Sequence, residues 1–230
     1  MISENLKQVR ENIVRACEKA GRDPAEVTLI AVSKTKPVSM LKEAYDEGVR
    51  CFGENKVQEI QEKFGLMPSD VKWHMIGHLQ RNKVRYLMDK ACLIHSVDSV
   101  RLAQEISKEA EKAGIVMPVL IEVNVAQEET KYGISVAEVL PLLMEIKDLP
   151  GISVQGLMTI APYVDDPEDN RQIFRALKKL SVDIRDKNVN NINMNILSMG
   201  MTGDYTVAVE EGATMVRVGT GIFGERDYKL

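Results

Sequence analysis

The sequence feature that most constrains the fold is a short apolar run that ends at a lysine. Residues 27–33 read Val-Thr-Leu-Ile-Ala-Val-Ser, Lys34 follows them, and Pro24 and Pro37 bound the segment. A run of this length is typical of a strand buried on both faces of a parallel sheet. A charge is costly inside such a strand, so Lys34 marks the strand end, where α/β folds place their functional groups. The alternative is that Lys34 only extends from a strand end into solvent.

The rest of the chain alternates short apolar runs with helical patterns. Strands are expected at 27–33, 51–53, 73–77, 91–97, 117–125, 152–160, 195–197 and 214–218. Helices are expected at 3–20, 38–47, 56–64, 78–88, 99–113, 135–147, 165–186 and 205–211. The pattern predicts an α/β fold, a (β/α)8 TIM barrel with an extra N-terminal helix, forming a single domain over residues 1–230. An open doubly wound sheet is the alternative, because periodicity does not show whether a sheet closes.

Composition narrows the functional classes. The formal net charge is -4, so the chain lacks the basic footprint of a nucleic-acid-binding protein. No apolar run is long enough to span a membrane, and the N-terminus lacks the apolar core of a signal peptide, so we expect a cytoplasmic protein without a membrane partner. The three cysteines and three histidines have neither disulfide-framework nor metal-ligand spacing, so no metal site is expected.

Polar residues gather where the predicted strands end, and in a barrel all these ends share one face. The set comprises Lys34, residues 53–55, residues 77–78, His95, Asn124, Lys131, residues 158–161, residues 198–201, Arg217 and residues 219–221. Arg217 interrupts an otherwise apolar run, and a buried guanidinium needs an acceptor. That acceptor is either a ligand or a carboxylate such as Glu122, and the sequence leaves both possibilities open.

Two glycine-containing turns follow the last two predicted strands. They supply glycines that permit close backbone approach and hydroxyl groups that can donate: Gly200, Gly203, Gly219 and Gly221, with Ser198 and Thr220. Exposed N–H groups at such turns attract phosphate, and a phosphate site after strands seven and eight recurs in barrels. The alternative is that the glycines serve tight turns alone, but two such turns at the two expected strands favour a phosphate site.

A lysine at one strand end and a phosphate site across the barrel mouth predict a phosphorylated aldehyde held as a Schiff base. A desolvated lysine near cationic groups has a lowered pKa, which favours the nucleophilic neutral amine. Pyridoxal 5'-phosphate (PLP) is the obvious ligand. A Schiff-base aldolase that acts on a phosphosugar would use similar parts and is kept as an alternative.

Five segments in chain order resemble the PLP homeostasis protein family. They are Ala-Val-Ser-Lys-Thr-Lys-Pro at 31–37, Phe-Gly-Glu-Asn at 52–55, Trp-His-Met-Ile-Gly-His-Leu-Gln-Arg-Asn-Lys at 73–83, Leu-Ser-Met-Gly-Met at 197–201 and Val-Arg-Val-Gly-Thr-Gly-Ile-Phe-Gly at 216–224. The resemblance implies a monomeric PLP barrel of fold type III, similar to the N-terminal barrel domain of alanine racemase.

The resemblance also implies roles for residues of the matching segments. Lys34 would bind PLP covalently as an aldimine, and Arg217 would face the pyridine nitrogen. The phosphate would be held by Ser198, Gly219 and Thr220. The remaining expected cofactor-binding residues are Asn55, His78, Met199 and Gly200.

The function implied by the resemblance is to carry or buffer PLP in support of vitamin B6 and amino-acid homeostasis, without enzymatic turnover. PLP-dependent apo-enzymes are the candidate protein partners, and Lys36 and Lys131 are either transient PLP acceptors or solvated surface lysines. The alternative is a PLP-dependent amino-acid racemase. Racemases of this type have a second, β-rich domain that supplies a catalytic tyrosine, and we expect no such domain in the sequence to residue 230.

Overall fold

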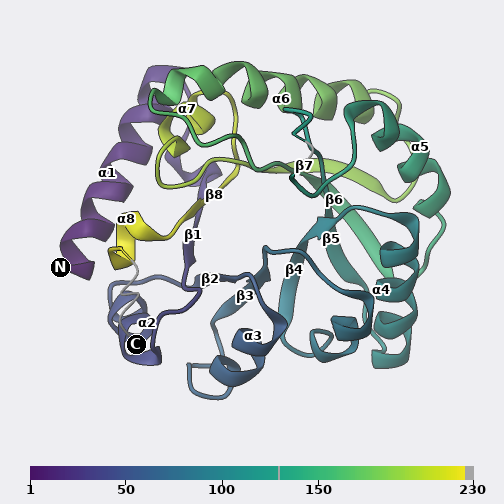
Figure 1. Cartoon of the computed structure of the whole chain (residues 1–230), viewed down its shortest axis with the longest axis horizontal. Helices are drawn as coiled ribbons and strands as arrows, with labels where there is room; N and C mark the ends of the chain where they lie inside the picture. Colours follow the sequence, from purple (N-terminus) through teal and green to yellow (C-terminus); the bar gives the residue numbers. More distant parts are fainter. Residues whose placement is uncertain (129, 226–230) are drawn as a thin grey trace.

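A computed structural model describes residues 1–128 and 130–225. Eight parallel strands form its centre: β1 (Thr28–Val32), β2 (Cys51–Glu54), β3 (Lys72–Met75), β4 (Ala91–Val97), β5 (Met117–Glu122), β6 (Ile152–Met158), β7 (Ile192–Ser198) and β8 (Met215–Val218). They pair in sequence order, and β8 pairs back onto β1 to close the barrel (Figure 1). Closure excludes the open sheet and confirms the predicted (β/α)8 barrel.

Helices surround the barrel, as Figure 1 shows. The α-helices are α1 (Ile2–Ala20), α2 (Val38–Asp46), α3 (Val57–Phe64), α4 (Val100–Ala113), α5 (Val136–Ile146), α6 (Arg171–Arg185), α7 (Tyr205–Glu210) and α8 (Thr220–Phe223). Within the described residues, the short 3-10 helices are η1 (Pro24–Glu26), η2 (Arg81–Tyr86) and η3 (Pro167–Asn170).

The α-helix expected at 78–88 is wrong, because η2 occupies that place. Its hydrogen bonds join residues three apart: the Leu87 N–H donates to the Val84 carbonyl at 3.0 Å. Val84 and Leu87 are both fully buried. Residues three apart lie above one another on a 3-10 helix, so this winding buries both side chains in a short segment where an α-helix would offset them.

The inside of the barrel has two layers of different character. Strand residues two apart point to the same face. On four strands the inward-facing residue is apolar, and the residue two positions further towards the carboxyl end is polar. The pairs are Leu93 and His95, Leu120 and Glu122, Ile196 and Ser198, and Met215 and Arg217. The polar member of each pair is buried. The barrel therefore has an apolar floor beneath a polar layer that lies next to the carboxyl ends of the strands.

Helix α1 is the predicted extra N-terminal helix, and it ends at Gly21 in the left-handed region at φ 64°. It packs against α7 and α8, so the first and last parts of the barrel lie side by side (Figure 1). The Asn5 amide donates to the Ile222 carbonyl at 2.9 Å, and the Asn12 amide donates to the Tyr205 hydroxyl at 2.9 Å. These bonds anchor the two short helices that flank β8.

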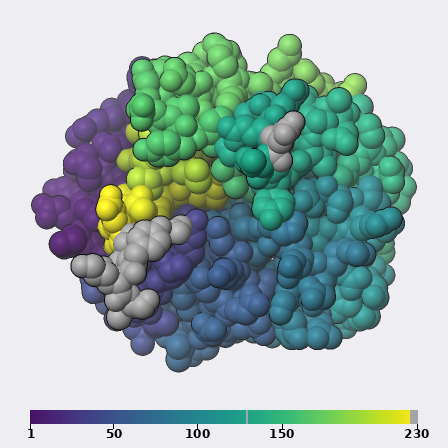
Figure 2. Space-filling view, in the orientation of Figure 1, coloured from purple at the N-terminus to yellow at the C-terminus, as the bar shows by residue number. Residues whose placement is uncertain are grey.

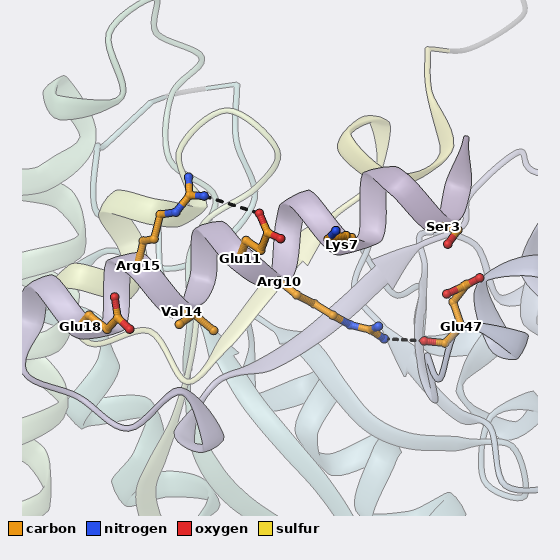
Figure 3. Close-up of a pocket in the computed structure, with 8 residues that line it drawn as sticks. All are labelled: Ser3, Lys7, Arg10, Glu11, Val14, Arg15, Glu18 and Glu47. Atoms are coloured by element: carbon orange, nitrogen blue, oxygen red, sulfur yellow. Dashed lines mark hydrogen bonds and ion pairs between the residues drawn. The ribbon is translucent and has the colours of Figure 1, made fainter.

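A surface groove runs along the outer side of α1 and reaches Glu47 at the end of α2. Figure 3 shows Arg15 paired with Glu11 across one turn of α1, and Arg10 reaching the Glu47 carbonyl. The groove lies on the outer side of α1 and is separate from the barrel mouth. Among the described residues, no helix combines the length and apolar character needed to cross a membrane, and no cluster of His, Cys, Asp and Glu is arranged for a metal ion.

Candidate functional site

Lys34 lies in a tight turn two residues beyond the end of β1 and is half-buried. The next residue, Thr35, has φ 64°, a left-handed conformation that β-branched residues rarely adopt. Such a turn persists only when its surroundings fix it. Ser33, on the other side of Lys34, is fully buried, and its N–H donates to the Gly53 carbonyl at 3.1 Å.

A buried ion network holds both neighbours of Lys34. The Lys63 ammonium donates to the Ser33 carbonyl at 2.9 Å, to Glu54 Oε1 at 2.8 Å and to Glu59 Oε2 at 2.9 Å. The Ser33 hydroxyl donates to Glu54 Oε1 at 2.6 Å, and the Thr35 N–H donates to Glu59 Oε2 at 2.9 Å. Lys63 and its two carboxylates therefore fix the backbone immediately before and after Lys34.

The pKa values of the two carboxyl groups in this network are shifted in opposite directions. Burial, reinforced by a hydrogen bond with Glu59, raises the pKa of Glu54 to about 8. Burial also works against ionisation of Glu59, but hydrogen bonds from Glu54, Lys63 and the Thr35 backbone outweigh it and lower its pKa. At neutral pH the network thus holds one ammonium, one carboxylate and one carboxylic acid, which is the charge balance that a buried cluster of this kind favours.

The turn that contains Lys34 is tied to the segment after β8. The Lys36 ammonium donates to the carbonyls of Phe223, Gly224 and Glu225 at 2.9–3.2 Å. A Cβ atom on Gly219 would lie only 3.3 Å from the Val32 carbonyl oxygen. In Figure 2 the yellow C-terminal segments accordingly lie beside the purple and blue N-terminal ones. Lys34 and the glycine turn after β8 are neighbours at the barrel mouth.

Two backbone N–H groups in this glycine turn converge on one oxygen atom. The N–H groups of Gly219 and Gly221 both donate to Thr202 Oγ1, each at 3.3 Å. A pair of N–H groups focused on a single oxygen is the donor set that a phosphate oxygen requires. The residues present therefore fit the phosphate of PLP, with the Thr202 hydroxyl at the position of an acceptor.

The glycines of the two turns differ in what they do. Gly200 has φ 89°, and a Cβ atom there would lie 2.6 Å from the Ala208 side chain, so both its conformation and its packing require glycine. A Cβ atom on Gly203 would meet nothing within 4 Å. The close approach expected of all these glycines thus holds at Gly200 but not at Gly203.

Arg217 lies inside the barrel in the polar layer and is 3% exposed. Its guanidinium donates to Ser198 Oγ at 2.6 Å and to the Thr159 carbonyl at 2.8 Å. Burial lowers its pKa to about 10, against the opposing charges of Glu122 and Asp204. Arg217 thus finds neutral oxygen acceptors through hydrogen bonds, and Glu122 acts on it as a nearby charge.

Glu122 is the electrostatic counterpart of Arg217 in the same layer. Burial, followed by the charge of Asp98, raises the pKa of Glu122 to about 7, although Arg217 acts in the opposite direction. Its Oε2 atom is buried and has no hydrogen-bond partner among the residues that the structure describes. A carboxyl group in this condition takes up a proton more readily than an exposed one.

The remaining predicted site residues lie at different depths around the mouth. Ser198 and Met199 are fully buried, and the Met199 N–H donates to the Met215 carbonyl at 3.1 Å. Thr220 is exposed as the first residue of α8, and Asn55 is half-buried where β2 ends. The structure therefore groups Lys34, Ser198, Arg217, Gly219 and Thr220 on or between neighbouring strands, with Asn55 one strand further on.

His78 and Lys131 lie at the other side of the mouth. The His78 ring stacks on the Tyr132 ring with centroids 4.0 Å apart, and His78 Nδ1 is 3.7 Å from Asp98 Oδ2. Lys131 forms an ion pair with Glu128 at 2.6 Å. These contacts connect the ends of β3 and β4 to the loop between β5 and α5, and they do not include Lys34 or Arg217.

Sequence reasoning missed several residues that shape this site. Lys63 follows Val57 and Ile60 at intervals of three, so it belongs to the buried face of α3, and that pattern is a detectable signal. Glu54, by contrast, belongs to the polar set predicted at the strand ends, and it ends β2 as a buried carboxyl. Thr202 had no such signal, because its hydroxyl meets Gly219 and Gly221 only through folding.

The comparisons with known proteins agree with this geometry. The family model of the alanine racemase N-terminal domain matches residues 5–227. In solved structures, an alanine racemase from Clostridium difficile has a TM-score of 0.75 at 18% identity, covering 98% of this chain and 58% of that one. The fold and the site thus define a barrel of the alanine racemase type.

More similar proteins define the particular family. The chain is 48% identical to the pyridoxal phosphate homeostasis protein of Aquifex aeolicus (strain VF5), with 98% of both chains covered. It is 40% identical to the protein of that name from Escherichia coli (strain K12), covering 99% of this chain and 97% of that one. The chain belongs to the pyridoxal phosphate homeostasis protein family.

A solved relative is PipY of Synechococcus elongatus PCC7942. Its structure without PLP has a TM-score of 0.86 and 34% identity, covering 97% of this chain and 100% of that one. Its structure with PLP bound has a TM-score of 0.83 and 33% identity over the same shares. The resemblance found in the sequence motifs is thereby confirmed.

The raised pKa of Glu54 predicts a pH dependence of stability. The folded-state pKa, about 8, lies above the ordinary value of 4.5, so the folded state binds the extra proton. The contribution is fully present below pH 4.5 and is lost as pH rises towards 8. In Glu54→Gln the amide stays neutral, so urea unfolding should show the variant gaining stability relative to the wild type by at least about 1 kcal/mol between pH 5 and pH 8.5.

The control for this experiment is Glu168→Gln, which removes an exposed carboxylate whose pKa is lowered by the Arg171 guanidinium. That control should show no relative gain in stability over the same pH range. A Glu54→Gln difference that is flat with pH would contradict a neutral Glu54 in the folded state.

Proposed function

We propose that this protein binds PLP at the barrel mouth and carries or buffers it, without turning over a substrate. The observation that supports this most strongly is the proximity of a fixed lysine turn, at Lys34, to two N–H groups focused on one oxygen, at Gly219 and Gly221. The names of the relatives and the PLP-bound PipY structure add support from similar chains. An amine beside a phosphate site matches two groups of PLP, the reactive aldehyde and the phosphate that anchors it.

We assign the covalent bond to Lys34. Its amine would add to the aldehyde carbon of PLP, form a C=N bond and release water. The turn after β8, with the backbone of Gly219 and the hydroxyl of Thr220, would hold the phosphate, and the backbone at Met199 and Gly200 would close that side. Arg217 would face the pyridine nitrogen, and Asn55 and His78 would border the mouth. PLP itself would supply the electrophilic aldehyde.

The chemistry of Arg217 supports the proposed absence of turnover. Its guanidinium is fixed by Ser198 and Thr159 and does not give up a proton at ordinary pH, so at the ring nitrogen of PLP it would leave that nitrogen unprotonated. An unprotonated ring withdraws electrons less strongly than one paired with a carboxylate. Racemisation also needs acid–base groups on both faces of the reacting carbon, and Lys34 can serve only one. These points favour a carrier over a racemase.

We further propose that residues 1–230 form one PLP-binding domain that acts as a monomer in the cytoplasm. PLP-dependent apo-enzymes would be its partners. A Schiff-base aldolase remains the other candidate function, and bound PLP in the protein as purified would decide against it.

The first prediction concerns the attachment site. Borohydride reduction of the protein with PLP should fix the cofactor on the peptide that contains Lys34, and Lys34→Ala should lose the visible imine band. The matched control is Lys131→Ala, because Lys131 lies at the other side of the mouth in an ion pair with Glu128, and that variant should keep the band. Mass spectrometry that places the wild-type adduct on Lys36 or Lys131 would refute the assignment.

The second prediction concerns the phosphate. Pyridoxal, which lacks the phosphate, should bind at least about a hundredfold more weakly than PLP, because each charge-assisted hydrogen bond is worth roughly 1.5–3 kcal/mol. Equilibrium titration followed by absorbance measures both affinities. Equal affinities for the two compounds would remove the basis for a phosphate site at the turn after β8.

The third prediction concerns function. Protein loaded with PLP should restore activity to the apo form of a PLP-dependent enzyme in a mixing experiment. It should show no steady racemase, decarboxylase or transaminase activity with common amino acids, since each missing acid–base group costs about 10²–10⁴-fold in rate. Steady turnover that disappears in Lys34→Ala would overturn the carrier and support the racemase.

A further inference from the structure

A continuous line of hydrogen bonds crosses the inside of the barrel from Arg217 to Cys92. The Arg217 guanidinium donates to Ser198 Oγ at 2.6 Å, and Ser198 Oγ lies 2.9 Å from His95 Nδ1. His95 Nε2 lies 3.0 Å from His74 Nδ1, and His74 Nε2 lies 3.5 Å from Cys92 Sγ. The line runs from β8 through β7 and β4 to β3 and back to β4.

The ends of the line fix its direction. A guanidinium only donates, so Ser198 must accept from Arg217. At the far end the Cys92 thiol donates to the Trp73 carbonyl at 3.2 Å, so its sulfur is free to accept from His74. Between these ends every hydrogen must go to the next residue along the line.

Only one arrangement satisfies the buried groups in the middle. The Ser198 hydroxyl donates its single proton to His95 Nδ1, the His95 Nε2–H donates to His74 Nδ1, and the His74 Nε2–H points at the Cys92 sulfur. In the reverse arrangement the Ser198 hydroxyl would accept from both neighbours, and its own proton would have no acceptor among the hydrogen bonds of the described residues. Buried hydroxyl groups rarely accept that loss. Both histidines therefore have their proton on Nε2.

The two rings are neutral. Burial, with the charge of Lys72, lowers the pKa of His74 to about 4. Burial also lowers the pKa of His95 well below its usual range, and the charges of His74 and Arg217 act in the same direction. The line is thus a chain of neutral groups that ends at one fixed cation.

We propose that Ser198 is a positioning residue for Arg217, oriented by His95 and His74, and that it is not a ligand of the PLP phosphate. Its proton is committed to His95, so it has none to donate to a phosphate oxygen, and one of its lone pairs is committed to Arg217. This inference rests on the proposed function, in which Arg217 faces the cofactor ring. It reassigns one residue that the sequence motifs grouped with the phosphate site.

The geometry explains why Arg217 needs such support. Ser198 Oγ and the Thr159 carbonyl engage the two terminal nitrogens of the guanidinium, Nη1 and Nη2, which together define its plane. Rotation of the Ser198 hydroxyl towards the mouth would break its bond to His95 and leave a buried ring nitrogen without a donor. The histidine pair thereby keeps the acceptor of Arg217 in place.

The first test uses the protein without PLP. The sequence has three histidines, so selective 15N labelling of their rings gives few signals. NMR correlation of ring nitrogens with ring protons should show His74 and His95 neutral and protonated on Nε2 at pH 7, with no change in Lys34→Ala. In Ser198→Ala, the His95 Nδ1 signal should shift as its donor is lost. Protonation of His95 on Nδ1 in the wild type would overturn the proposal.

The second test distinguishes a role of Ser198 at the cofactor ring, through Arg217, from a role at the phosphate. Ser198→Ala should keep the ratio of PLP to pyridoxal affinity within about threefold of the wild type, whereas loss of a phosphate ligand would reduce that ratio about tenfold or more. An Arg217→Gln variant is measured alongside, and the imine absorbance band of Ser198→Ala should shift in the same direction as the band of that variant. Thr202→Val is the matched control, because its hydroxyl lies at the phosphate turn, and it should alter the ratio without moving the band.

Each result has a distinct meaning. A tenfold fall of the affinity ratio in Ser198→Ala would return Ser198 to the phosphate site, and an unmoved band would show that it does not position Arg217; either outcome overturns the proposal. A wild-type protein that binds no PLP would instead refute the proposed function, and the histidine protonation in the ligand-free protein would still decide the hydrogen-bond line.

Discussion

Burial of the Arg217 cation inside a closed barrel is the constraint on which the rest of the site depends. Barrel interiors are normally filled by branched apolar side chains, and a guanidinium there loses its hydration. Ser198 and the Thr159 carbonyl accept its hydrogen bonds, and Glu122 supplies a compensating field. Because Ser198 needs its own acceptor, the polar layer extends to two histidines. One charge thus accounts for a whole interior layer above an apolar floor.

A second buried cation fixes the neighbouring side of the mouth. Lys63 comes from α3, outside the barrel wall, and its ammonium connects β2 to the turn after β1. Removing one partner of such a network leaves an uncompensated buried charge, which typically costs 3–5 kcal/mol. The strained Thr35 conformation is therefore held by interactions of the protein itself. A lysine turn that is already in place loses little conformational entropy when it binds a ligand.

The sequence predicted the barrel and its mouth because both depend on local patterns. Lys34 and Arg217 interrupt apolar runs, and such an interruption can be seen without a structure. Partners that meet through folding could not be predicted: Thr202 meets the N–H groups of Gly219 and Gly221 across the gap between two turns. The α-helix predicted at 78–88 was wrong for another reason. Burial of Val84 and Leu87 in a short connection favours the 3-10 helix η2 over the α-helical period. The roles given to individual cofactor ligands stay predictions.

The shared barrel does not by itself decide between a carrier and a racemase. Solved racemases with 15–18% identity have TM-scores of 0.70–0.75 to this chain, which shows a common fold and nothing about a common reaction. The reaction depends on which groups surround the reacting carbon. In this protein the hydrogen bonds of the described mouth hold a lysine turn and an arginine in place. If Lys34 binds PLP covalently, as we propose, the bond would be released when another amine took the place of Lys34, so the same bond would serve both storage and transfer.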